Sequence, residues 1–214
     1  MQGLIGKKVG MTQVYDGEGH RVAVTVVEVG PCVVVQKKTV EKDGYDVVQL
    51  GFGERKERGV SKAALNRFKK IGSSPKRWLR EFTIDKGEEV KAGDAVTVAI
   101  FEGVPYVDVT GITKGRGFQG VMKRHLMSGG PMTHGGHSKR RVGSIGQNAF
   151  PARVLKGKRM PGHMGNVRMT QQNLKVVQLR VAENLILIRG AIPGANGSII
   201  AVMKALKKTA VKTK

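Results

Sequence analysis

Short runs of β-branched and other apolar residues occupy much of the first half of the chain, and turn-forming residues separate them. The clearest run is Arg21–Val29, which is bounded by Gly19 and by the Gly30-Pro31 pair. Similar runs lie at residues 33–38, 46–52, 78–84 and 95–101. Turn signals such as Asp43-Gly44 and Lys86-Gly87 fall between them. Short strands at this spacing predict a mainly β fold built on a small antiparallel β-barrel.

A helical pattern interrupts these strands at residues 61–71, where Ser61 can cap the first turn and Gly72 can end the last one. The segment predicts a short helix with its apolar residues facing inward. Strand patterns return near the C-terminal end, at residues 174–181, 184–189 and 199–203, with a turn at 193–197. We expect these three strands to complete the barrel that the first half begins.

The middle of the chain has a different composition. Residues 111–168 hold 13 glycines and 12 Lys and Arg residues, and only 118–126 could form a helical turn or two. Long stretches without a core-building pattern are usually functional or disordered, so we expect an extension that its partner orders. The predicted organisation is a discontinuous globular domain (1–122 plus 168–206), an extension (123–167) and a basic tail (207–214).

Charge sharpens this division. The chain carries 38 Lys and Arg residues against 16 Asp and Glu residues, a formal net charge of +22. Residues 1–108 are nearly balanced, with 18 basic and 15 acidic residues, and residues 109–182 contain no acidic residue at all. So large a surplus predicts a polyanionic partner. Nucleic acid is favoured over a membrane surface because its phosphates are dense and continuous.

The single cysteine, Cys32, excludes an internal disulfide and a cysteine-rich zinc site, and its valine neighbours predict a small buried side chain. The first residues show no signal-peptide pattern, and no apolar run approaches the roughly 20 residues of a membrane helix. We therefore expect a soluble, intracellular protein.

Residues 115–120 match the glycine pattern G-x-G-x-x-G of dinucleotide-binding sites. That fingerprint also needs an acidic residue about 20 positions later to hold a ribose hydroxyl, and none occurs before Glu183. The preferred interpretation is that the backbone approaches phosphate closely here, with Lys114 and Arg116 supplying charge.

His134 and His137 are three positions apart, but zinc would need further ligands, and no carboxylate or thiol lies nearby. Hydrogen bonding or stacking with bases and sugars is the favoured role. Basic clusters at 139–141 and 156–159 are interpreted as phosphate contacts, although such runs elsewhere are often only solvated surface. No nucleophile, base and acid occur together, so we expect no enzyme activity, no cofactor and no metal.

Five blocks of the chain resemble bacterial large-subunit ribosomal protein L-three, a universal family. They are residues 1–12, 107–120, 143–147, 156–165 and 184–197. The resemblance extends from residue 1 to about 203. It implies a translation-protein-like barrel that binds large-subunit rRNA of the 23S type early in assembly, beside other large-subunit proteins. It also implies an extension directed towards the peptidyl transferase centre, and a cytoplasmic location in the ribosome.

Carried onto this chain, the resemblance places the tip of the extension near residues 146–148. The residues expected to contact rRNA are Lys114, Arg116, Lys123, Arg124, His125, His134, His137, Lys139, Arg140, Arg141, Gln147, Asn148, Arg153, Lys156, Lys158, Arg159, His163 and Arg168.

This chain departs from the family pattern at three positions. His125 stands where many members have Trp, and Val142 where Pro is common. Ala149 replaces a glutamine that some members methylate, so that modification is not expected here. Two other hypotheses remain: a general nucleic-acid chaperone or DNA-binding architectural protein, and a barrel enzyme with a nucleotide cofactor.

Overall fold

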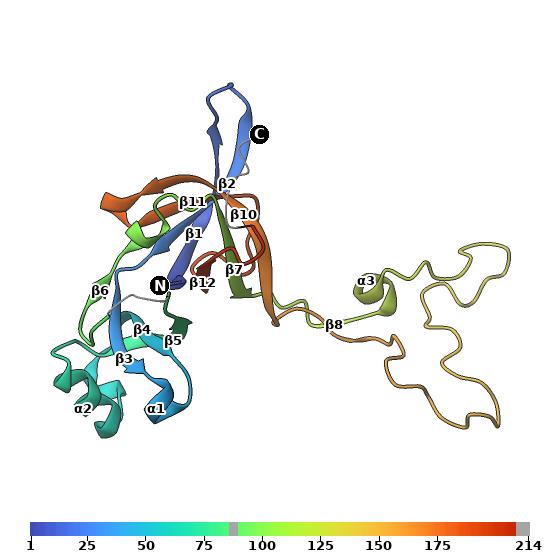
Figure 1. Cartoon of the computed structure of the whole chain (residues 1–214). Helices are drawn as coiled ribbons and strands as arrows, with labels where there is room; N and C mark the ends of the chain where they lie inside the picture. The colour runs from blue at the N-terminus through green and yellow to red at the C-terminus, as the bar shows by residue number, and fades with distance from the viewer. Residues whose placement is uncertain (86–89, 209–214) are drawn as a thin grey trace. The chain divides into compact units, whose positions relative to one another are not determined.

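The computed structural model describes residues 1–85 and 90–208 (Figure 1). The predicted turn at Lys86-Gly87 and residues 209–214 of the predicted tail lie outside the described residues. The strands are β1 (Gly3–Tyr15), β2 (Arg21–Val29), β3 (Cys32–Lys38), β4 (Val47–Glu54), β5 (Lys76–Thr83), β6 (Ala95–Val96), β7 (Tyr106–Ile112), β8 (Phe118–Gln119), β9 (Gly162–His163), β10 (Arg168–Arg180), β11 (Leu185–Arg189) and β12 (Ile199–Lys204). The helices are α1 (Val40–Asp43), α2 (Lys62–Lys70) and α3 (Val121–His125), and 3₁₀ turns cover Glu57–Gly59, Val98–Phe101 and Val181–Glu183.

Six strands close into an antiparallel barrel in the order β1-β12-β7-β10-β11-β2. Strands from the two ends of the chain alternate in it, because β12 lies between β1 and β7, and β11 lies between β10 and β2. The predicted fold class, mainly β with a small antiparallel barrel, is therefore confirmed.

The membership of the barrel differs from the prediction. Four segments expected in it, now β3, β4, β5 and β6, instead form a separate sheet in the order β5-β4-β3-β6. Only Ala95 and Val96 of the segment 95–101 are strand, because the chain then turns to bury Val98 and Phe101. An apolar pattern indicates that a segment is a strand, but not which strand it pairs with.

Strand β1 was missed because its glycines interrupt the apolar pattern. The structure shows why a glycine is needed in it: a methyl group at Gly3 would lie 2.5 Å from the carbonyl oxygen of Val202 on β12. Leu4 and Ile5 beside it are fully buried. The backbone of β1 therefore lies very close to that of β12, while its side chains pack in the core. A pattern of residue propensities does not reveal this combination.

One continuous core joins the barrel to the separate sheet, and it contains Leu4, Ile5, Val34, Leu50, Phe101 and Ile186 among others. Cys32 lies within it, and burial raises the pKa of its thiol to about 11, so the predicted small buried side chain is confirmed. Helix α2 is also confirmed, with the Ser61 hydroxyl accepting a hydrogen bond from the Ala64 amide at 3.5 Å. Of the apolar residues at 61–71 that were expected to face inward, only Phe68 is buried.

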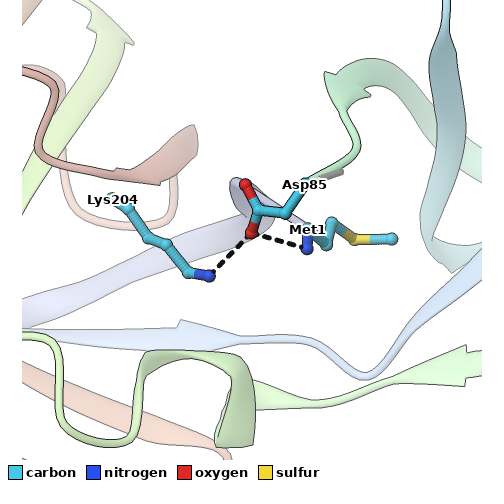
Figure 2. Close-up of polar contacts among 3 residues, drawn as sticks. All are labelled: Met1, Asp85 and Lys204. Carbon is cyan, nitrogen blue, oxygen red and sulfur yellow. Dashed lines mark hydrogen bonds and ion pairs between the residues drawn. The ribbon is translucent and has the colours of Figure 1, made fainter. Parts of the chain in front are cut away.

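An ion-pair cluster joins the two ends of the globular part (Figure 2). The Asp85 carboxylate lies 3.0 Å from the Met1 amino group and 3.0 Å from the Lys204 ammonium. Hydrogen bonds from Lys204 and then from the Met1 amine lower the pKa of Asp85 from 3.8 to about 2. The three groups link β1, the segment after β5, and β12.

Asp85→Asn should lower the free energy of unfolding by at most about 1 kcal/mol at neutral pH, because the carboxylate is 36% exposed and solvent screens its ion pairs. A carboxyl with a lowered folded pKa stabilises the fold above its unfolded pKa of about 4, and this contribution is lost as pH falls through the folded value. Thermal melts should therefore show a difference in Tm between the original chain and the variant at neutral pH. A difference that persists unchanged near pH 2 would contradict this assignment.

The chain divides into two compact units. Unit 1 comprises Met1–Ile112 and Arg168–Lys214, which include the barrel and the four-stranded sheet. Unit 2 is Thr113–Val167, and the predicted extension, 123–167, falls within it. Among the described residues, no helix is long and apolar enough to cross a membrane.

Candidate nucleic-acid interface

The two ends of unit 2 run side by side and form its root. The Thr113 amide donates to the Val167 carbonyl at 3.0 Å, and the Arg116 amide donates to Met164 at 2.8 Å. Beyond these bonds β8 pairs with β9. Gly165 has a φ of +76°, and a methyl group on it would lie 2.1 Å from the Lys114 carbonyl oxygen, so only glycine allows the two chain segments to approach so closely.

The G-x-G-x-x-G segment forms one side of this root. A dinucleotide fingerprint opens a helix that packs on a parallel sheet. Here the segment leads into the two-residue strand β8 and the five-residue helix α3, so that structural context is missing. Apart from the adjoining residues, no described atom lies within 4 Å of the position that a methyl group would take on Gly117 or Gly120, which leaves this backbone open to a partner.

Helix α3 contacts the second half of unit 2 near Met160. The Arg124 guanidinium donates to the Met160 carbonyl at 2.7 Å, and His125 Nε2 lies 3.1 Å from the same oxygen. Val121 is the only buried residue of unit 2, all of which is described. Arg124 and His125 therefore have a positioning role that the sequence did not indicate. A guanidinium has five N–H donors, so Arg124 can still reach a phosphate.

Between Leu126 and Pro161 the chain forms neither helix nor strand. Isolated bonds shape it, such as the Gly130 amide to the Lys139 carbonyl at 3.0 Å and the Ser144 hydroxyl to the Gly146 carbonyl at 2.8 Å. At the predicted tip, residues 144–148 and 152–154 line a shallow hollow to which Gln147, Asn148 and Arg153 contribute. This backbone is irregular and almost free of a core, as expected for a segment shaped to fit a partner.

Unit 2 carries 11 Lys and Arg residues and no Asp or Glu. Among the residues predicted to contact nucleic acid, His125 alone is half-buried and all the others are exposed. None of the 11 cations forms an ion pair with any described residue. Arg168 lies at the start of β10 in unit 1, where it pairs with Ile112. The charges of unit 2 therefore add to one positive field that no internal acid neutralises.

His134 and His137 are both exposed, and His134 has a left-handed backbone with a φ of +53°. Among the described residues, no three His, Cys, Asp or Glu side chains lie close enough together to hold a metal ion. The two imidazoles are thus accessible for hydrogen bonding or stacking.

Sequence reasoning overlooked several exposed apolar side chains of unit 2. Phe118 is 74% exposed at the root, and Phe150 is 85% exposed beside the tip. Aromatic rings in such positions can stack on unpaired bases. The sequence did contain a signal for these exposed rings: each is an aromatic residue in an acid-free segment without apolar periodicity. Such a segment builds no core that could bury the ring.

Comparisons with known proteins agree on one family. A family model described as Ribosomal protein L3 matches residues 79–181, which include all of unit 2. The chain is 53% identical to Large ribosomal subunit protein uL3 of Brachyspira hyodysenteriae over 208 residues, which cover 97% of this chain and 96% of that protein. Its identity to the proteins of the same name is 51% for Corynebacterium jeikeium and 48% for Alkaliphilus metalliredigens. These matches also cover 97% of this chain, and 95% and 99% of the relatives.

Proposed function

Because this chain belongs to the ribosomal protein L3 family, we propose that direct contacts with large-subunit rRNA, made mainly by unit 2, hold it in the large ribosomal subunit. The family makes the chain a structural protein of that subunit and not an enzyme. Its place is therefore the ribosome, and its partners are rRNA and other ribosomal proteins.

The observation that carries the rRNA proposal is the unneutralised charge of unit 2. Its 11 cations have no acid within the unit, so like charges are concentrated in one segment, and this favours a polyanion as the partner. Neutralising phosphates with Lys and Arg releases counterions, which favours binding. In this proposal the predicted basic residues position the backbone of the RNA, and Gln147, Asn148 and the two exposed histidines reach bases and sugars.

We also propose that unit 2 is the extension that reaches towards the peptidyl transferase centre, with residues 146–148 nearest to it. The support is the resemblance of residues 143–147 and 156–165 to the family's extension blocks. We further propose a role in subunit assembly, and two physical arguments support it. A segment with one buried residue needs its partner for order, and a segment threaded between RNA helices must be in place before they close.

Site-specific crosslinking within purified large subunits tests the proposal. A photoreactive residue at Asn148 should yield crosslinks to large-subunit rRNA, because the tip would lie against it. The control places the same photoreactive residue at Lys42, an exposed position of α1 in unit 1. Crosslinks from position 148 to protein alone would contradict direct rRNA contact at the tip.

Competition binding separates this function from a general nucleic-acid chaperone or DNA-binding architectural protein. At fixed, near-physiological salt the full chain should prefer large-subunit rRNA over duplex DNA, because a shaped segment fits one folded RNA. Equal affinity for both would favour the general binder.

A further inference from the structure

The near balance of charge in the first half of the chain hides a second basic region. Residues 55–80 contain ten Lys and Arg residues and a single acid, Glu57. Glu54 and Glu81 flank the region and form ion pairs with Lys76 of the region at 4.0 Å and with Lys38 outside it at 2.7 Å, respectively. This excess of nine positive charges lies entirely in unit 1.

The fold gathers part of this charge around one hollow at the end of the four-stranded sheet. β4 and β5 are paired, and the Arg55 amide donates to the Pro75 carbonyl at 2.9 Å, which closes the base of the loop between them. The hollow is lined by one acidic residue, Glu54, and by Arg55, Lys56, Arg58, Gly59, Arg77 and Trp78. No described residue forms an ion pair with any of its four basic side chains, all of which are exposed.

One of these arginines stacks on an aromatic ring, and a second lies beside a glycine. The Arg77 guanidinium lies over the Trp78 ring, 4.6 Å from its centroid. Trp78 in turn rests on the backbone of Gly53, where a methyl group would lie 2.6 Å from the ring. The Arg55 guanidinium lies against Gly59, with Nε 3.5 Å from the position of a methyl group there. A stacked guanidinium keeps its N–H edge free, and an arginine held in this way loses less entropy when it binds phosphate.

We propose that this hollow is a second RNA-binding surface, at which Arg55, Arg58 and Arg77 hold the sugar-phosphate backbone of an RNA helix. Helix α2 follows in the same loop and adds four exposed cations, so the surface offers positive charge over more than one phosphate. Phosphate is favoured over carboxylate as the partner chemistry because an RNA backbone supplies negative charge continuously. The inference rests on the proposed function for RNA as the partner, but it assigns a contact outside the extension.

The test measures the affinity of the full chain for transcribed large-subunit rRNA across a salt series. The R55Q/R58Q/R77Q variant should show a slope of log K against log salt that is shallower by about two to three, since each duplex phosphate contact contributes about 0.9. Its affinity near physiological salt should fall about ten- to a hundredfold. The control R21Q/K42Q/K91Q removes the same charge from exposed positions of unit 1 outside residues 55–80, and its slope should change by less than about one.

Trp78 is the only tryptophan, so its fluorescence reports on this hollow directly. Addition of rRNA should change the emission of the original chain and of a K139Q/R140Q/R141Q variant in unit 2. The emission of the R55Q/R58Q variant, which keeps Arg77 on the ring, should change much less. Circular dichroism melts of each variant verify that the fold is retained.

The outcomes separate this surface from the proposed function. If the 139–141 variant loses affinity while R55Q/R58Q/R77Q behaves like its control, the second surface is overturned and the function of unit 2 stands. If neither set changes rRNA affinity, both proposals fail. If R55Q/R58Q/R77Q loses binding to poly-glutamate but keeps rRNA affinity, the hollow serves an acidic protein and the RNA assignment is overturned.

Discussion

Replacing residues 120–161 with a two-residue Asn-Gly loop is expected to lower the affinity of the chain for large-subunit rRNA by about three orders of magnitude near physiological salt. Gln119 and Gly162 are paired across β8 and β9, so a short hairpin can join them. The replacement removes nine Lys and Arg residues. If half of these contact phosphate, the salt slope should become shallower by about four.

The same truncation should leave unit 1 folded, with a Tm within a few degrees of the original. The reason is that the main core cluster contains no residue between 113 and 167. Binding titrations and thermal melts of one sample measure both effects. The matched control is the full-length chain with the nine cations changed to Gln. Full affinity in that control would contradict a charge-based mechanism, and an unfolded truncated chain would show that unit 2 supports the barrel.

Asp108→Ala should be the most damaging single substitution outside the apolar core, lowering the free energy of unfolding by about 2–3 kcal/mol. Asp108 is 2% exposed as a residue, and its carboxylate accepts hydrogen bonds from the Asn173 amide at 2.7 Å and the Leu206 amide at 3.4 Å. The register of β10 against β7 shifts between Gln171 and Leu174, so Asp108 takes the place of a strand partner there. Removing it leaves the Asn173 and Leu206 amides without this acceptor at a part-buried site.

Chemical denaturation measures this effect, and Tm should fall by roughly 5–10 °C for a chain of this size. Asp108→Asn keeps an acceptor oxygen and should lose less. Asp46→Ala is the control, since Asp46 is exposed and accepts one bond, from the Val40 amide at 3.1 Å. A loss for Asp108→Ala no larger than for Asp46→Ala would show that the buried carboxyl does not stabilise the bulge.

Charge and exposure in the candidate site were predictable, but the packing roles were not. A segment without acids and without apolar periodicity cannot build a core, so its lysines and arginines had to remain exposed, as Lys139 and Arg159 do. The bond from Arg124 to the Met160 carbonyl depends on chain segments 36 residues apart, and no local pattern encodes it. The cluster around Trp78 was also missed, because acids elsewhere in the first half masked its charge in the total.

Local sequence was sufficient for β2, α2 and the fold class, because alternation, a serine cap and turn glycines act over a few residues. The partition of strands between the barrel and the sheet β5-β4-β3-β6 was decided only in three dimensions. The strand β1 shows the reason. Its glycines read locally as interruptions, but Gly3 provides room for the backbone of Val202, about two hundred residues away along the chain. Strand pairing and core closure depend on such distant partners, whereas the absence of acidic residues from 109–182 is a property of the sequence alone.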